Sequence, residues 1–367
     1  MSRIDDLIQE LAPTGVQYSR VDEVAVLKRG TAITKKSVVD GPVPVIAGGR
    51  TPAYFHNESN RAGENVVIAG SGAYAGFVSY WSRPIYVSDA FTVVPKDDRV
   101  SARYLYFWLQ SQQELLHSFK SGGGVPHVYP RSVSGIRIPV PPLEVQREIV
   151  RVLDKFTQLE AELEAELEAR RVQYEHYRHS AVGKPQFANN KWVPLASIAD
   201  IHTGVKPDEI SEHGAFPYIN AGIEPSGFTN RSNSRGNVVT IPSRGQGGAG
   251  HVGYQRNDFW CGPLCYRIES KSRVLLTRFL YFYLRNVQDE LVALRKTGSI
   301  PAVNKSDLGG VLVPVVPVQE QQRVVKALDK FDALVNDISI GLPAELNARR
   351  QQYEYYRDRL LTFKEAV

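Results

Sequence analysis

The stretch ARRVQYEHYR, Ala169–Arg178, returns almost unchanged as ARRQQYEYYR at Ala348–Arg357, close to the C-terminus. The word LDKF also occurs twice, starting at Leu153 and at Leu328. Sliding the chain on itself by 175 residues superposes the two LDKF words and, upstream of them, YLYFWL on FLYFYL. The polypeptide is therefore a tandem duplication of one unit of roughly 175 residues. A long period that is present twice indicates a duplicated domain rather than a solenoid.

Each repeat has two parts that differ in their sequence pattern. The first, of about 130 residues, alternates β-branched and aromatic runs with Gly and Pro, which is typical of short strands joined by turns. Here NVVIAGS, from Asn65, aligns with NVVTIPS, from Asn237, and a single helix is expected near residues 101–119. The second part follows the proline-rich words PVPPLE and PVVPVQ, and its apolar residues recur at helical spacing.

This pattern predicts an α+β fold with two pseudo-twofold-related mixed α/β domains, separated by two long antiparallel helices that form a coiled-coil spacer. The predicted boundaries are 1–142 and 183–317 for the globular modules, and 143–182 and 318–367 for the helical spacers. Gly341 and Pro343 in the word SIGLP predict an interruption of the second spacer. The residues expected to pair the helices are Ile149, Leu153, Phe156, Leu163, Leu167, Val324, Leu328, Phe331, Leu334 and Ile338.

The aromatic residues of the helical segments are expected to be structural. The helical spacing of Tyr104, Phe107 and Trp108 favours a position in the core rather than base stacking. Tyr174, Tyr177, Tyr353 and Tyr356 are expected to pack between helices or against a partner subunit.

Charge is distributed unevenly along the chain. The net charge is +5, but residues 143–178 carry −3 and residues 318–365 carry zero, so the remaining residues carry +8. Positive charge concentrated in the globular modules is the distribution that a nucleic-acid-binding protein needs. No apolar run is long enough to span a membrane, so no membrane partner is expected.

Motifs for catalysis or cofactor binding are weak. Gly245, Gly247 and Gly250 form a GxGxxG pattern, but a strand-like segment follows where a dinucleotide fold requires a helix. Cys261 and Cys265 lack the second Cys/His pair that a zinc site needs, so we expect free thiols and no metal site. One alternative stays open, a metal-dependent nuclease built on Asp258, Glu269 and Lys271, because these residues form a loose D…ExK pattern.

Two variable modules, each followed by a helix with LDKF near its start and ARR.QYE.YR near its end, resemble the specificity subunit of type I restriction–modification enzymes. The resemblance covers the whole chain. It implies a non-catalytic, cytoplasmic subunit whose two target-recognition domains each grip half of a bipartite, asymmetric site on double-stranded DNA. It also implies a helical spacer that binds two methyltransferase subunits, joined by restriction/translocase subunits. S-adenosylmethionine, ATP and Mg²⁺ would belong to those partners, and none would be bound by this chain.

Comparing the repeats identifies the loop residues expected to contact DNA. At these aligned loop positions the two modules share the surrounding sequence but carry different side chains, as expected if each module reads a different DNA sequence. Arginine favours guanine and asparagine favours adenine, whereas lysine is suited to phosphate. The predicted DNA-binding residues of the first module are Lys28, Arg29, Lys35, Lys36, Arg50, Tyr74, His127, Tyr129 and Arg131. Those of the second module are Lys206, Arg231, Arg235, Arg244, Gln246, His251, Lys296, Asn304 and Lys305. A protein-binding scaffold with two modules is the remaining alternative.

Overall fold

The computed structural model describes residues 3–122, 124–271, 274–296, 298 and 300–366. Proximity of Cα atoms divides the chain into two compact units, one of residues 1–164 with 346–367 and the other of residues 165–345. Each unit holds one β-rich module together with segments of the long helices, so the second half of the chain repeats the architecture of the first.

The first module is built on three small sheets. Their strand orders are β2-β8-β5-β6, β4-β3-β7 and β1-β9. All the pairings are antiparallel except that of β3 with β7. The strands are β1 (Gln17–Arg20), β2 (Ala25–Arg29), β3 (Val43–Ile46), β4 (Tyr54–His56), β5 (Asn65–Ala69), β6 (Val78–Trp81), β7 (Tyr86–Val87), β8 (Ala90–Pro95) and β9 (Arg137–Val140).

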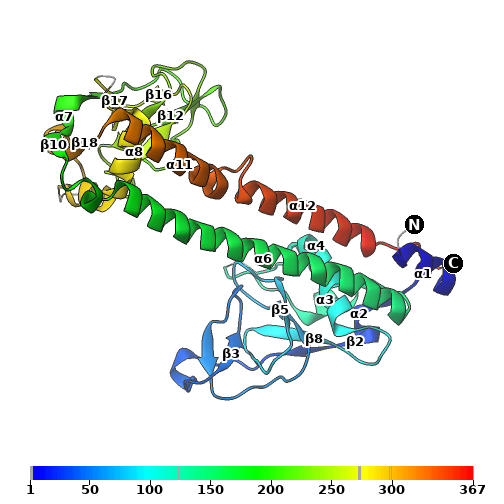
Figure 1. Cartoon of the computed structure of the whole chain (residues 1–367). Coiled ribbons are helices and arrows are strands. Elements are labelled where there is room, and N and C mark those ends of the chain that lie inside the picture. The colour runs from blue at the N-terminus through cyan, green and yellow to red at the C-terminus, as the bar shows by residue number, and fades with distance from the viewer. Residues whose placement is uncertain (1–2, 123, 272–273, 297, 299, 367) are drawn as a thin grey trace. The chain divides into compact units, whose positions relative to one another are not determined.

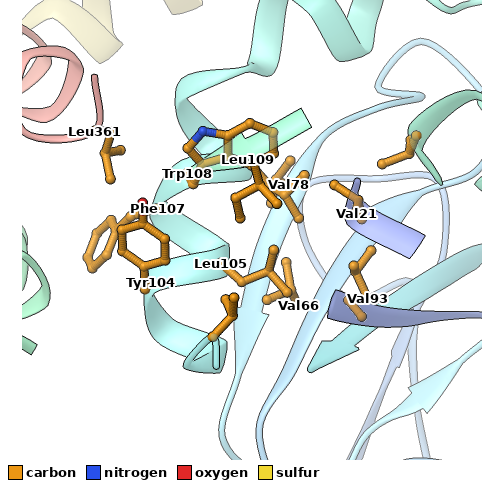
Figure 2. Packing of buried hydrophobic residues seen from close by; sticks show 14 of the residues in the cluster. Val21, Val66, Val78, Val93, Tyr104, Leu105, Phe107, Trp108, Leu109 and Leu361 are labelled. Carbon is orange, nitrogen blue, oxygen red and sulfur yellow. The ribbon is translucent and has the colours of Figure 1, made fainter. Parts of the chain in front are cut away.

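Strand β5 is buried on both faces, which explains its continuous apolar sequence. Val66 and Ile68 belong to the core cluster that includes helix α3 (Ala102–Ser111), whereas Val67 belongs to a separate cluster on the other face. In Figure 2, Leu105 and Leu109 of α3 lie between the helix and the strands that carry Val66 and Val78, whereas Tyr104 and Phe107 lie on the opposite side of the helix, toward Leu361. The prediction that Tyr104, Phe107 and Trp108 are core residues is confirmed, because all three are buried.

The second module repeats these sheets in the same order, as β11-β17-β14-β15, β13-β12-β16 and β10-β18. Again one pairing, β12 with β16, is parallel. The strands are β10 (Lys191–Pro194), β11 (Ala199–Thr203), β12 (Phe216–Ile219), β13 (Phe228–Thr229), β14 (Val238–Pro242), β15 (Gly253–Gln255), β16 (Trp260–Cys261), β17 (Cys265–Ser270) and β18 (Leu312–Val315).

Strand register corrects one detail of the internal alignment. Val66 pairs with Val93 in the first module, and Val239 pairs with Ile268 in the second. Val66 therefore corresponds to Val239, so the alignment of the two NVV words, which matched Val66 with Val238, is wrong by one residue.

The helical segment after β8 contains two helices rather than the single one expected. It breaks at Gln112 into α3 and α4, and the second module has the corresponding pair α8 and α9. The other helices are α1 (Arg3–Leu11), α2 (Val21–Val24), α4 (Gln113–Ser118), α5 (Pro130–Ser134), α6 (Leu143–Val182), α7 (Leu195–Ile198), α8 (Thr277–Asn286), α9 (Gln288–Ala293), α10 (Lys305–Gly309), α11 (Val318–Asn336) and α12 (Leu342–Leu360), with 3-10 turns η1 (Lys35–Ser37) and η2 (Lys184–Phe187).

Helix α6 is one uninterrupted helix, whereas the second helical region is divided into α11 and α12 (Figure 1). The predicted interruption at SIGLP is confirmed. A Cβ atom on Gly341 would lie 2.4 Å from the carbonyl oxygen of Ala333 and 2.7 Å from that of Leu334, so only glycine fits this close turn. Pro343 lies in the first turn of α12, where its missing N–H costs little.

A buried glutamine near the start of the helix fixes each long helix to its module. Gln146 donates to the carbonyl oxygens of Arg99 (2.7 Å) and Pro141 (2.8 Å) and accepts from the N–H of Ser101 (3.0 Å). In the second repeat Gln321 makes the same three bonds, at 2.7, 2.7 and 2.8 Å, to Val274, Val316 and Leu276. Neither glutamine was singled out from sequence, since a polar residue near a helix start is ordinarily exposed.

The aspartate of each LDKF word receives an arginine from the module. Arg103 lies 2.6 Å from Asp154, and Arg278 lies 2.6 Å from Asp329. Each guanidinium also lies over three aromatic rings at 4.5–5.0 Å from their centroids. The repeated word therefore marks the junction of a long helix with the module that precedes it.

In the first unit the LDKF motif near the start of α6 packs against the ARRQQYEYYR motif of α12. We call LDKF the opening motif of a repeat and ARR.QYE.YR its closing motif. The ring of Phe156 stacks on Tyr356 at 5.6 Å and contacts Tyr353 at 6.3 Å. One turn further along α6, Glu160 accepts from Arg350 at 2.6 Å. Because the residue numbers rise along α6 while they fall along α12, these segments are antiparallel.

The second unit contains the reciprocal contact. Tyr177 of the closing motif of α6 lies 5.3 Å from Phe331, and the Tyr174 hydroxyl lies 3.5 Å from Asp332. Burial, followed by the charge of Asp332, raises the pKa of Tyr174 well above its ordinary value. The LDKF motif of each repeat thus packs against the ARR.QYE.YR motif of the other repeat. This explains why the two motifs are duplicated together.

The predicted helix-pairing residues differ in their environments. Ile149, Leu153 and Leu328 are fully buried and Leu167 is nearly so, whereas Phe156, Leu163, Val324 and Phe331 are half-buried. The prediction for Ile338 is wrong: it lies between α11 and α12 and is 83% exposed, because the helix ends at Asn336. Leu334 is also exposed, and its neighbour Val335 is the buried residue of that turn.

Candidate nucleic-acid interface

Three segments of the first module converge around an extended segment at His127. Its backbone pairs with Ser121, while the N–H of Val128 donates to the Gly70 carbonyl at 3.0 Å. The N–H of Gly72 donates to the Pro126 carbonyl at 2.9 Å, which fixes the 70–77 loop beside this segment. A Cβ on Gly48 would lie 2.4 Å from the Ser71 carbonyl, so the loop that carries Arg50 also approaches closely.

This geometry gathers four of the predicted DNA-binding residues, which we call the Tyr129 cluster: Arg29, His127, Tyr129 and Arg131. The guanidinium carbons of Arg29 and Arg131 lie 5.4 and 5.3 Å from the centroid of the Tyr129 ring. The His127 ring lies 5.9 Å from it at an interplanar angle of 9°. Because side chains alternate along an extended chain, burial of Val128 places His127 and Tyr129 on the opposite, outer side.

Arg50 and Tyr74 form a second contact nearby in the first module. The Arg50 guanidinium lies 4.8 Å from the Tyr74 ring centroid and 5.6 Å from that of Phe77. Lys28 at the end of β2, and Lys35 and Lys36 in η1, are exposed. The structure therefore brings together the arginine and aromatic candidates of this module.

The arginines at the junctions of the fold and those among the predicted DNA-binding residues of the first module differ in their partners. Arg103, Arg137 and Arg278 pair with carboxylates, as expected for structural residues. Within the described ranges Arg29, Arg50 and Arg131 have no carboxylate partner, and each lies over an aromatic ring instead. Cations without an internal anion remain available to an anionic or acceptor-rich ligand.

The second module has the same loop framework. Ala302 pairs with Lys296 and Arg244, as His127 pairs with Ser121 and Ser71. The N–H of Gly245 donates to the Pro301 carbonyl at 3.1 Å. His127 therefore corresponds to Ala302, as the internal alignment predicted.

The other candidates of the second module lie in and around this framework. Asn304 precedes α10 and Lys305 begins it, and both are exposed. Lys296 lies 3.4 Å from Asp307, so part of its charge is already balanced. The remaining exposed candidates are Lys206, Arg231, Arg235, Arg244 and Gln246.

His251 differs from the other candidates because it is half-buried. Burial, followed by the nearby charges of Arg285 and Arg295, lowers its pKa below the ordinary value for histidine. His251 is therefore neutral at pH 7 and supplies no positive charge for phosphate binding.

The residues of the nuclease alternative have separate structural roles. Asp258 accepts from the Gly236 N–H at 2.9 Å, and Lys271 contacts the Ala196 carbonyl at 2.6 Å. In the part of the chain that the structure describes, no three His, Cys, Asp or Glu side chains gather to hold a metal ion.

Other sequence features have structural explanations. Gly245 and Gly250 have φ of 147° and 74°, and strand β15 follows them, so the GxGxxG residues form a turn. Cys261 and Cys265 are free and buried in strands β16 and β17. Among the helices that the structure describes, none has an apolar stretch long enough to cross a bilayer.

Comparison with known proteins gives a consistent result over both repeats. Residues 13–169 and 189–348 match the family model of the type I restriction modification DNA specificity domain. A putative type I restriction enzyme specificity subunit of Haemophilus influenzae is 26% identical over 95% of this chain and 96% of its own length. A type I restriction enzyme specificity subunit of Escherichia coli is 28% identical over 82% and 86%. The crystal structure of a type I restriction–modification S subunit from M. genitalium aligns with a TM-score of 0.68 at 20% identity, over 95% of this chain and 96% of that one.

Proposed function

The chain belongs to the type I restriction modification DNA specificity family, and from that premise we propose that it reads one DNA site in two unlike halves, one through each module. As a specificity subunit it serves DNA recognition in a multi-subunit complex, and the catalytic activities belong to other subunits. The nuclease and scaffold alternatives have no support.

One observation carries the proposal of unlike half-sites: corresponding scaffold positions hold different chemistry. His127, Tyr129 and Arg131 of the first module are replaced by Ala302, Asn304 and Ser306 in the second. Bases are distinguished by the donors and acceptors at their edges, and arginine and asparagine favour different bases. Two modules with these differences select different sequences.

The proposed partners are two methyltransferase subunits, together with restriction/translocase subunits, which carry S-adenosylmethionine, ATP and Mg²⁺. Exposed apolar side chains on the helices support such assembly, since large exposed apolar patches mark interaction sites. In the first unit a groove of about 1240 Å³ is lined by residues of α1, α6 and α12, among them Ile8, Phe156 and Tyr355. Tyr355 is 61% exposed, so its ring adds accessible apolar surface to this groove.

The test uses the chain together with its methyltransferase subunits. Methylome sequencing of cells that carry this complex should show a bipartite motif with two different halves. Binding of the purified complex to duplex DNA should weaken steeply with salt, because phosphate neutralisation releases counterions. Identical inverted halves would contradict the proposal of unlike half-sites. Weak binding that is insensitive to salt would instead favour a protein-binding scaffold.

A further inference from the structure

The Tyr129 cluster has the properties of a preformed base-reading element, an interpretation that rests on the proposed function. A cation–π contact attracts the guanidinium charge to the ring and does not depend on hydrogen bonds from its N–H donors. Arg29 and Arg131 both lie over the ring of Tyr129, at 5.4 and 5.3 Å. Their donors therefore remain available while the ring restricts their motion.

Two cations over one ring repel each other unless a ligand supplies acceptors. Among the described residues neither Arg29 nor Arg131 pairs with a carboxylate, in contrast to Arg103, which lies on three rings and also pairs with Asp154. The cluster is thus electrostatically incomplete, and a ligand with closely spaced acceptors relieves the repulsion.

The backbone under the cluster is held firmly. Arg61 donates to the Arg29 carbonyl at 2.7 Å and to the Thr92 hydroxyl at 3.3 Å, which fixes the end of β2. Val128 is buried next to Tyr129, and Pro130 begins helix α5 directly after it. Side chains placed by rigid elements discriminate between ligands better than side chains on mobile loops.

We propose that the Tyr129 cluster reads guanine in the half-site of the first module, with Arg29 and Arg131 donating to the O6 and N7 acceptors. Guanine presents both acceptors on its major-groove edge, and bidentate arginine is the commonest specific contact to it. Tyr129 and His127 position the two guanidiniums.

The second module lacks this element at the corresponding place. Ala302, Asn304 and Ser306 stand for His127, Tyr129 and Arg131, and Thr203 stands for Arg29 at the end of the first strand of the larger sheet. The guanine contact therefore belongs to one half-site only. At that position the second module presents Asn304, whose amide suits adenine.

The experiment selects duplexes from a randomised pool with the complete methyltransferase complex. The key variant installs the residues of the second module in the first: His127→Ala, Tyr129→Asn and Arg131→Ser together. The preference for guanine at one position of the first half-site is expected to fall roughly 5- to 150-fold, which corresponds to the 1–3 kcal/mol of a bidentate base contact. Unchanged selection of the other half-site shows that the variant complex is folded.

A conservative variant separates base reading from phosphate binding. Arg131→Lys keeps the charge but loses the planar donor fork, so the guanine preference should fall while the salt slope of binding stays constant. Arg83 offers a matched control, because its guanidinium also lies over an aromatic ring, 5.6 Å from the Trp81 centroid. It follows the C-terminal end of β6, whereas Phe77 precedes the N-terminal end of that strand. Arg83→Lys should leave the selected sequence unchanged.

The outcomes distinguish this inference from the function on which it rests. If the variants bind more weakly but select the same guanine, the cluster contacts phosphate and the inference is overturned. If the wild-type complex selects no sequence, the proposed function fails and the inference fails with it. Loss of guanine selection in the first half-site alone supports both.

Discussion

The buried glutamines Gln146 and Gln321 provide a direct test of how each module is fixed to its helix. We consider Gln146→Leu, which keeps a similar side-chain volume but removes all three hydrogen bonds. The change leaves the buried carbonyl group of Pro141 and the partly buried carbonyl of Arg99 and N–H of Ser101 without this partner.

The expected loss follows from these three groups. A buried polar group left unsatisfied costs about 1–3 kcal/mol, and local relaxation recovers part of this. Because two of the three groups are only partly buried, the first unit should lose about 2–4 kcal/mol, a large fraction of the roughly 5–15 kcal/mol that stabilises a typical protein. Gln321→Leu should cost the second unit a similar amount, because its three bonds have the same lengths within 0.3 Å or less.

Equilibrium unfolding of the full chain in urea measures the loss, and hydrogen exchange locates it in one unit. Trp81 and Trp108 report on the first unit, and Trp192 and Trp260 report on the second. The effects of the two variants should add, since the two glutamines share no hydrogen-bond partner. Gln158→Leu is the matched control: this glutamine is exposed on α6 and donates to Glu162, so its change should stay within about 0.5 kcal/mol.

A loss below about 1 kcal/mol in Gln146→Leu would refute this reasoning, because at least one buried group must lose its partner. A loss of the same size in Gln158→Leu would show that the effect comes from the leucine and not from the broken bonds.

Two further predictions concern the long helix and pH. Deleting Leu163–Glu166 removes four residues of α6. Four helical residues advance about 6 Å and rotate about 400°, and the roughly 40° beyond a full turn nearly equals the rotation of one base pair of DNA. The unread spacer in the methylated motif should therefore shorten by about one base pair. An unchanged spacer with full methylation would show that this helix does not set the distance. His251 has a lowered pKa in the folded chain, so the unfolded chain binds its proton at higher pH, and the second unit should lose stability as pH falls below about 6.5. His251→Phe, which copies Phe77 of the first module, should reduce that loss in urea midpoints measured from pH 7.5 to 5, whereas an unchanged pH dependence would rule out His251 as its source.

Much of the architecture was predictable because it depends on local patterns. The duplication, the strand-rich modules, the helices and the break at Gly341 each follow from periodicity or from a residue with a special backbone preference. The one-residue error before β14 has a local cause as well. The two asparagines were aligned because they are identical, whereas the hydrogen-bonded register matches Asn65 with Val238.

The sequence predicted a set of candidate residues for DNA contact, but not which of them lie together in the folded module. Arg29 and Arg103 look alike in sequence, and both lie over aromatic rings in the structure. Only the fold brings Asp154, distant in sequence, against Arg103, whereas no carboxylate of the described residues pairs with Arg29.

The sequence by itself determined the repeat, the order of its elements and the family to which they belong, because these are properties of patterns along the chain. Tertiary structure alone decided that Gln146 is buried, that Ile338 is exposed, and which cations of the described residues lie over aromatic rings without a carboxylate partner. The physical reason is that burial and charge pairing depend on groups that the fold brings together across long sequence separations, and no periodicity along the chain records those contacts.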